Sequence, residues 1–212
     1  MLQNIVIIGA GGFGREVQWL IERINKQKNI YNLIGYIDDG IVAGTEVNGY
    51  KVLGGIDYLL NMKEDIAAVC AIGAAKTRKK VIERLLCKEN IVFPNLIDSS
   101  VEMSQYVEMG QGNIICAGCI LTVNIKLEDF NIINLSCTIG HDVDIRSFVT
   151  VYPGVNISGC VCVGNATELG TGSKIIQGKT ISENVIVGAG AVVVKDILVE
   201  GTYVGVPSNK VR

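Results

Sequence analysis

The sequence is poor in charged side chains, aromatic side chains and histidine. Charged residues make up 19% of the 212 residues, and 19 Lys and Arg against 21 Asp and Glu leave a net charge of −2. Such a chain has no basic excess with which to bind nucleic acid through a positive surface, so we exclude that class of function. Aromatic residues are only 6%, whereas hydrophobic residues reach 49%. We therefore expect a folded protein with a sizeable aliphatic core.

Long apolar runs and a leader sequence are also missing. No apolar run in the sequence approaches the roughly 18–20 residues of a membrane span. The N-terminus enters an apolar segment at Asn4 to Ile8 without the basic region or cleavage site of a secretory signal. These features predict a cytoplasmic protein without a membrane span.

Cysteine and histidine decide whether a metal site is expected. The seven cysteines are odd in number and their spacing suggests no disulfide framework, which favours a reducing compartment. Cys116 and Cys119 form the only Cys-x-x-Cys pair. Zinc would need two further ligands and the chain has one histidine, so we predict no metal and interpret the pair as small apolar filler.

Residues 1–94 alternate between strand-like and helix-like patterns. The apolar run that ends at Ile8 leads into the glycine-rich segment Gly9 to Gly14, and apolar residues then recur at helical spacing up to Ile24. Apolar runs at 33–37 and 66–72 predict two more strands, and a basic helix follows the second of them. This order predicts a small Rossmann-like α/β domain, in which helices cover a parallel sheet.

Residues 95–200 follow a repeat of six. Eighteen consecutive positions at this spacing are aliphatic, although Val, Ile, Leu and Met are only 73 of the 212 residues. A period of six fits neither an α-helix nor a coiled coil, and it predicts a parallel β-helix of hexapeptide repeats with three repeats in each coil. The positions are Ile97, Met103, Met109, Ile115, Leu121, Leu127, Ile133, Ile139, Ile145, Val151, Ile157, Val163, Leu169, Ile175, Ile181, Val187, Val193 and Val199.

The repeat also sorts the residues between these positions. Four residues after each aliphatic position the chain is again mostly apolar or small, which predicts a second inward position. Two residues after it the chain is mostly polar or small, which predicts an outward position, and His141 occupies one of these. We expect residues 201–212 to form a C-terminal tail, whose uncharged segment from Tyr203 to Pro207 offers surface for an oligomer to bury.

The two halves together resemble a known family. The period of six, the run Gly188 to Val193 and the ending Gly205 to Pro207 are typical of left-handed β-helix acyltransferases. With Gly9 to Gly14 and the acidic pair Asp38-Asp39, the chain is similar to bacterial sugar-nucleotide acetyltransferases of the bacillosamine, perosamine or viosamine type. Sialic-acid O-acetyltransferases share this layout. The resemblance implies a homotrimer, acetyl-CoA in the groove between subunits, a sugar nucleotide on the N-terminal domain, and no metal.

His141, the single histidine, is the candidate catalytic residue. An amine that attacks a thioester must lose a proton, and a neutral imidazole is available as a base near neutral pH. The resemblance implies that His141 is this general base and that Asp142 orients the imidazole. Neighbours on a strand point to opposite faces, so the two side chains meet only if the backbone turns there, and Asp144 is the alternative partner. An ordinary surface histidine among solvated carboxylates is the competing interpretation.

Further site residues of the second half are implied by the resemblance. Gly159 matches the position whose backbone N–H stabilises the oxyanion, and Asn134 matches a polar position near the site. The groove for acetyl-CoA would be lined by Thr150, Gly159, Thr171 and Ala189.

The N-terminal domain is expected to hold the acceptor. Glycines after a strand let backbone approach phosphate, and a helix N-terminus favours negative charge. The resemblance implies that Gly11, Gly12 and Phe13 hold the pyrophosphate, that Asp38 and Asp39 recognise the base or ribose, and that Gly73 lies beside the same crevice.

Several functions remain open from the sequence. The first is N-acetylation of a nucleotide-linked amino sugar, with UDP as the expected nucleotide. The same base would serve O-acetylation of a sugar such as sialic acid, and a non-catalytic scaffold that binds nucleotide sugars is a third hypothesis. The glycine fingerprint by itself suggests an NAD-linked oxidoreductase, but the domain is too short for a full dinucleotide fold and the repeats would have no role. The sugar, the acyl chain length and the pathway are left undetermined by the sequence.

Overall fold

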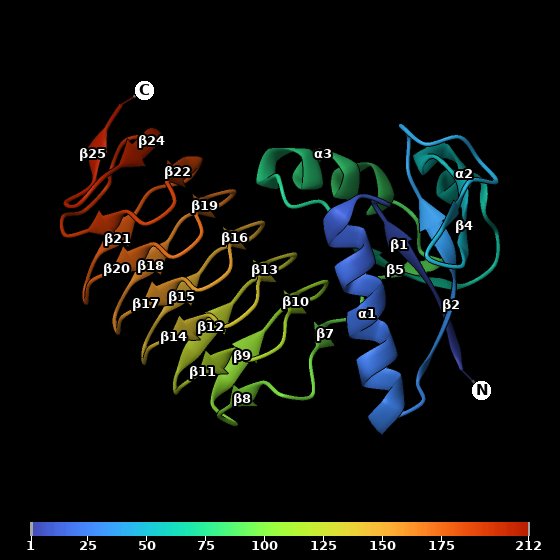
Figure 1. Ribbon diagram of the computed structural model, residues 1–212, viewed down its shortest axis with the longest axis horizontal. Helices are drawn as coiled ribbons and strands as arrows, with labels where there is room; N and C mark the ends of the chain where they lie inside the picture. The colour runs from blue at the N-terminus through green and yellow to red at the C-terminus, as the bar shows by residue number, and fades with distance from the viewer. Residues whose placement is uncertain (1, 212) are drawn as a thin grey trace.

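The computed structural model describes residues 2–211, which form a small α/β domain followed by a parallel β-helix (Figure 1). The N-terminal sheet has six strands in the order β3-β4-β2-β1-β5-β6, and all neighbours are parallel except the β3–β4 hairpin. The elements are β1 (Gln3–Ile8), α1 (Gly12–Gln27), β2 (Tyr31–Ile37), β3 (Glu46–Val47), β4 (Tyr50–Gly54), α2 (Ile56–Asn61), β5 (Ile66–Cys70), α3 (Ala75–Leu85) and β6 (Ile91–Val92).

Helices cover both faces of this sheet. The α1 residues Val17 and Leu20 pack on one face, in a cluster that also contains Leu96 and Ile114 of the β-helix. Helices α2 and α3 pack on the other face, where Ile82 lies in a second cluster. Helix α1 therefore lies between the sheet and the first coils of the β-helix, as Figure 1 shows.

The β-helix has three sheets, of eight, six and five strands. Each strand from Leu96 to Ile175 pairs in parallel with the strand eighteen residues later, as Ile120 does with Thr138 and Lys126 with Asp144. The strands are β7 (Leu96–Ile97), β8 (Glu102–Met103), β9 (Val107–Met109), β10 (Ile114–Ile115), β11 (Ile120–Leu121), β12 (Ile125–Leu127), β13 (Ile132–Ile133), β14 (Thr138–Ile139), β15 (Asp144–Ile145), β16 (Thr150–Val151), β17 (Asn156–Ile157), β18 (Cys162–Val163), β19 (Glu168–Leu169), β20 (Lys174–Ile175), β21 (Thr180–Ile181), β22 (Val185–Val187), β23 (Val192–Val193), β24 (Gly201–Val204) and β25 (Asn209–Lys210).

The core of the β-helix is built from the predicted aliphatic positions. All of those from Ile115 to Val193 are buried in one cluster, and the second inward position is confirmed by residues such as Cys119 and Val143. The two ends differ: Met103 is 40% exposed and Val199 is 57% exposed. Met103 lies in the first coil and Val199 follows the last repeat, so each has a neighbouring coil on one side at most.

Each corner between strands from Gly112 to Gly190 contains a residue with left-handed backbone. This residue lies three positions after a core aliphatic residue, and it is Asn124, Asp142 and Cys160 in three successive coils, with φ of 55°, 57° and 56°. Glycine fills other corners, for example Gly154 with φ of 70°. The three sheets form the sides of a three-sided prism, and the corners lie along its edges. Because one coil has eighteen residues, residues eighteen apart lie next to each other along one edge of this prism.

The C-terminal segment extends the β-helix, although the sequence suggested a separate tail. Strand β24 pairs in parallel with β22, and β25 returns antiparallel to β24. Val206 lies beyond β24 and is 72% exposed. Within residues 2–211, no helix combines the length and apolar character that crossing a membrane requires.

A buried arginine joins α3 to the β-helix. Arg78 is 1% exposed, and burial lowers its pKa to about 10, which keeps the guanidinium charged at neutral pH. Every hydrogen bond that it donates goes to a backbone carbonyl. The acceptors are Ile72 and Gly73 in its own domain and Phe130, Phe148 and Val149 in the β-helix, at 2.7–3.1 Å.

A second charged contact joins α1 to the first coil. Arg23 donates to both carboxylate oxygens of Asp98, at 2.5 and 2.9 Å. The Asp98 side chain is 1% exposed, and the hydrogen bond from Arg23 lowers its pKa to about 2. The two domains are thus fixed to each other at two separate points.

Candidate active site

His141 and Asp142 lie at the corner between β14 and β15. The left-handed backbone of Asp142 turns its side chain toward the imidazole, so that His141 Nδ1 and Asp142 Oδ2 are 2.8 Å apart. Asn124, eighteen residues earlier, donates from Nδ2 to Asp142 Oδ1 at 3.1 Å. The rival Asp144 pairs with Arg146 at 3.2 Å. Because the backbone turns at this corner, the two side chains meet, although neighbouring residues on a strand point to opposite faces.

The charge at this corner favours one tautomer of the imidazole. The hydrogen bond from His141, followed by that from Asn124, holds the pKa of Asp142 below its usual range. An ionised Asp142 accepts a hydrogen bond from Nδ1–H of the neutral ring and leaves Nε2 as an acceptor. The His141 side chain is 49% exposed, so Nε2 is accessible to a substrate.

Two glycines shape the space around the imidazole. Gly159 lies eighteen residues after His141, and a Cβ there would be 2.5 Å from Nε2 and Cε1 of the ring. A Cβ on Gly140 would be 2.7 Å from the nitrogen of Gly159. Among the described residues, the Gly159 N–H has no recorded acceptor. The absence of both side chains leaves room for the ring over the Gly159 backbone, and Gly159 itself is buried.

Asn134 and Thr150 lie away from this corner. Asn134 is 8% exposed, and its Oδ1 accepts from the N–H of Leu135 at 2.7 Å. Thr150 is 1% exposed, and its hydroxyl donates to the carbonyl of Gly73 at 2.7 Å. A side chain so buried has no surface for a cofactor, and Thr150 instead joins the two domains.

Asn124, which holds Asp142, was not predicted from the sequence. Asn134 precedes Gly140 by one hexapeptide, and a hexapeptide is one side of the prism, so the two residues belong to different corners. Spatial neighbours of Asp142 are found at an offset of eighteen, which is the length of a coil and leads to Asn124. The sequence therefore contains a signal for Asn124, at an offset of eighteen residues, which is three hexapeptides.

The predicted groove residues lie along two edges of the prism. Thr171 and Ala189 are exposed and follow β19 and β22, at the corner between the eight-stranded and six-stranded sheets. His141 and Gly159 lie at the corner between the six-stranded and five-stranded sheets. Within one chain, the two pairs do not face a common groove.

A crevice lies at the carboxyl ends of the N-terminal strands. It has a volume of about 220 Å³, and its lining includes both aspartates of the acidic pair. Asp38 Oδ2 accepts from the N–H of Ala10 and its Oδ1 from that of Gly40, each at 2.8 Å. Asp39 Oδ1 accepts from Ile56 N–H at 2.8 Å, at the start of α2. The acidic pair thus organises the loops of the crevice.

The start of α1 adjoins this crevice through the glycine segment. Gly11 is the N-cap and provides no side-chain cap, and the first turn contains no acidic residue. A Cβ on Gly14 would be 2.0 Å from the carbonyl oxygen of Gly9, so only glycine fits there. Gly11 and Gly12 are exposed, whereas Phe13 is half-buried against the core of the domain. The uncapped N–H groups at this helix N-terminus are suited to binding an anion, although the Asp38 carboxylate already accepts from the neighbouring N–H of Ala10.

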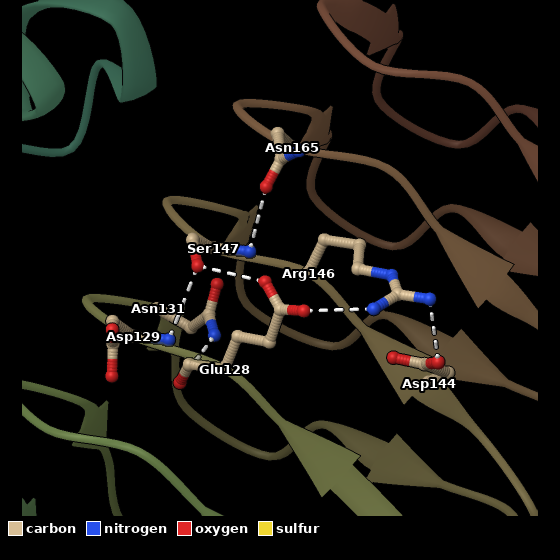
Figure 2. Close-up of polar contacts among 7 residues, drawn as sticks. All are labelled: Glu128, Asp129, Asn131, Asp144, Arg146, Ser147 and Asn165. Atoms are coloured by element: carbon tan, nitrogen blue, oxygen red, sulfur yellow. Dashed lines mark hydrogen bonds and ion pairs between the residues drawn. The ribbon is translucent and has the colours of Figure 1, made fainter.

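A second polar cluster lies on the β-helix away from His141 (Figure 2). Glu128 accepts from Arg146 Nη1 and from Ser147 Oγ, both at 2.8 Å, and Arg146 also pairs with Asp144. The N–H of Ser147 donates to Asn165 Oδ1 at 3.1 Å. The hydrogen bond from Arg146 lowers the pKa of Glu128. Arg146 faces two carboxylates, so the cluster keeps a net negative charge, but its side chains bind one another, which is typical of a structural network.

Comparison with known proteins gives consistent matches. Residues 4–85 match the family described as the PglD N-terminal domain. Over 190 residues the chain is 30% identical to GDP-perosamine N-acetyltransferase of Escherichia coli O157:H7, covering 87% of this chain and 82% of that protein.

Solved structures match over the whole chain. The acetyltransferase domain of PglB from Neisseria gonorrhoeae FA1090, in complex with acetyl coenzyme A, has a TM-score of 0.90 at 27% identity and covers 100% of both chains. PerB from Caulobacter crescentus, in complex with CoA and GDP-perosamine, has a TM-score of 0.88 at 27% identity and covers 100% of this chain and 99% of that one. These matches confirm the predicted fold, an α/β domain followed by a left-handed β-helix.

Proposed function

The chain belongs to the family of sugar-nucleotide amino-sugar N-acetyltransferases, and from this premise we propose that it acetylates the amino group of a nucleotide-linked amino sugar with acetyl-CoA. The observation that carries the proposal is the exposed His141, hydrogen-bonded through Nδ1 to Asp142 and lying over the backbone of Gly159. A surface histidine without a role would need neither the carboxylate partner nor the glycine beneath it.

In this proposal His141 is the general base. The amine attacks the carbonyl carbon of the thioester, and its proton passes to Nε2 while Asp142 holds Nδ1–H. The tetrahedral intermediate then collapses, the C–S bond breaks, and the imidazolium returns the proton to the sulfur of coenzyme A. No covalent acetyl-enzyme is formed.

The Gly159 N–H is our proposed donor to the oxyanion of the intermediate. Its support is geometric, since within residues 2–211 this N–H donates no hydrogen bond and the ring of His141 is adjacent. A backbone donor of fixed position stabilises developing negative charge without having to reorganise during the reaction.

The crevice of the N-terminal domain is the proposed acceptor site. The uncapped start of α1, with Gly11, Gly12 and Phe13, suits the pyrophosphate. Asp39 uses Oδ1 for the loop, which leaves Oδ2 for a hydroxyl or base N–H of the ligand. The sequence favours UDP as the nucleotide, whereas one relative is named for GDP-perosamine and another is solved in complex with it, so both nucleotides belong in the test.

The proposed assembly is a homotrimer with acetyl-CoA between subunits. Thr171 and Ala189 lie along one edge of the prism and His141 along another, so the two edges share a groove only if a second copy supplies one of them. A trimeric mass in sedimentation equilibrium is expected. The seven cysteines are unpaired, which supports the cytoplasm as the proposed location.

The test is a thiol-release assay with acetyl-CoA and a panel of UDP-, dTDP- and GDP-linked 4-amino sugars, with sialic acid alongside. Release with an amino-sugar nucleotide supports the proposal and identifies the nucleotide. Release with sialic acid alone would make the chain an O-acetyltransferase. Absence of both release and acetyl-CoA binding would favour a non-catalytic scaffold.

A further inference from the structure

One exposed cysteine lies at the same corner as the proposed base. Cys160 follows Asp142 by eighteen residues, and its N–H donates to the carbonyl of His141 at 2.8 Å. Its left-handed backbone, with φ of 56°, matches that of Asp142. One ligand-type atom each from His141, Asp142 and Cys160 lies within 4.8 Å of the other two. The proposed acetyl transfer does not use this thiol.

We propose that these three side chains bind Zn²⁺. An imidazole nitrogen, a carboxylate oxygen and a thiolate sulfur are the donor types that zinc prefers, and three protein ligands leave a fourth position for water. Metal–ligand bonds of about 2.0–2.3 Å place such donors roughly 3.5 Å apart. The three side chains are exposed, so small rotations bring them to this separation.

The backbone and the neighbours already organise this set of donors. Adjacent coils are hydrogen-bonded at the corner, so the three Cα positions are fixed relative to one another. Asn124 holds Asp142 through Oδ1, and Oδ2 faces the imidazole. Only one carboxylate is present beside nitrogen and sulfur, which favours Zn²⁺ over Mg²⁺ or Ca²⁺.

Zinc at this site inhibits the enzyme, and this consequence rests on the proposed function. Binding displaces the thiol proton of Cys160 to solvent and occupies the imidazole and the carboxylate that orients it. His141 then has no lone pair for the proton of the amine. The cation therefore opposes the transfer and is no cofactor of it.

The site is tested by titrating the reduced, metal-free full chain with Zn²⁺ in competition with a chromophoric chelator. The wild type is compared with Cys160→Ser and with Cys162→Ser, a matched control that removes an exposed thiol two residues away. We expect one Zn²⁺ per chain in the wild type and the control, and affinity at least about tenfold weaker in Cys160→Ser. Equal affinity in all three proteins, or loss in Cys162→Ser alone, would overturn the site.

A turnover assay tests the consequence separately. Zn²⁺ should inhibit the wild type and Cys162→Ser, and EDTA should restore their rates, whereas Cys160→Ser should keep its basal rate and resist Zn²⁺. Equal inhibition of Cys160→Ser would contradict the proposal. If the chain acetylates no acceptor, the proposed function fails, and the titration still decides whether zinc binds.

Discussion

The imidazole of His141 is oriented by the carboxylate of the next residue, which in a regular strand would point to the opposite face. Asp142 reaches Nδ1 because its own backbone is left-handed, and Asn124 keeps the carboxylate from turning away. Gly159 then provides the surface on which the ring lies. Four residues in three coils thus define one proton acceptor at Nε2.

Replacing Gly159 by alanine should displace the ring of His141. The added methyl would lie 2.5 Å from Nε2 and Cε1, which is closer than van der Waals contact. We expect kcat to fall by at least about tenfold with little change in melting temperature, because the ring is exposed and can rotate away. Steady-state kinetics and thermal melting measure this, with the exposed neighbour Ser158→Ala as control. An unchanged kcat in Gly159→Ala would mean that the ring position does not matter.

The sequence identified part of this site and missed the rest for a physical reason. His141 was found as the single histidine, on an outward position of the hexapeptide, and Gly159 was implied by the family resemblance. Asn124 was missed because side chains that lie next to each other on the β-helix are eighteen residues apart in the sequence. Thr150 was expected in the acetyl-CoA groove, but the N-terminal domain covers its outward side chain. The period of six describes the β-helix but not what packs against it.

Single positions at the corners of the β-helix require a left-handed backbone conformation. Left-handed backbone costs about 1–2 kcal/mol for residues with a Cβ, whereas glycine adopts it freely and asparagine tolerates it. At Gly154, φ is 70° and a Cβ would meet nothing within 4 Å. A substitution there therefore reports the backbone cost without a steric clash.

Gly154→Val should lower the free energy of unfolding by about 1–2 kcal/mol, and Gly154→Asn by clearly less. Urea unfolding monitored by circular dichroism compares the three proteins. If valine and asparagine were equally destabilising, the loss would arise from something other than the left-handed corner.

The ends of the β-helix were less predictable than its middle. The period of six continues to Val199, yet the last coil is completed by β24, which pairs with β22 outside the repeat. Strand pairing of this kind depends on which edge is available at the end of the prism. A local pattern of apolar residues does not contain that information.

The two domains act as one body because charged side chains are buried between them. Arg78 binds carbonyls of both domains, and one of these, Gly73, also accepts from Thr150. Gly73 follows β5, which ends near the crevice of the N-terminal domain. The junction therefore fixes that crevice relative to the β-helix that carries His141.

Arg78→Met should destabilise the whole protein. It removes the donor from five carbonyls, and buried groups that lose a charged partner cost about 3 kcal/mol in total or more. We expect the melting temperature to fall by about 6–12 °C. Arg84→Met is the matched control on the same helix, since Arg84 is exposed and pairs only with Asp57. Equal shifts for both variants would contradict a special role of the junction.

The Arg23–Asp98 contact predicts a pH dependence of stability. The folded pKa of Asp98, about 2, lies below the ordinary value of 3.8 for this side chain, so the contact contributes fully above about pH 4 and is lost as the pH falls through about 2. Asp98→Asn should therefore melt below the wild type at pH 7, and the difference should shrink between pH 4 and pH 2. A difference that stays constant across this range would show that ionisation of Asp98 does not stabilise the fold.

The most direct test of the proposed function replaces His141 by asparagine and measures acetyl transfer and ligand binding on the same protein. The acceptor is the nucleotide-linked amino sugar on which the wild type is most active. Removal of the general base predicts that kcat falls by about 10²–10⁴-fold, while calorimetry finds acetyl-CoA and the sugar nucleotide bound with unchanged affinity. A kcat within a few-fold of the wild type would contradict the assignment of His141 as the base.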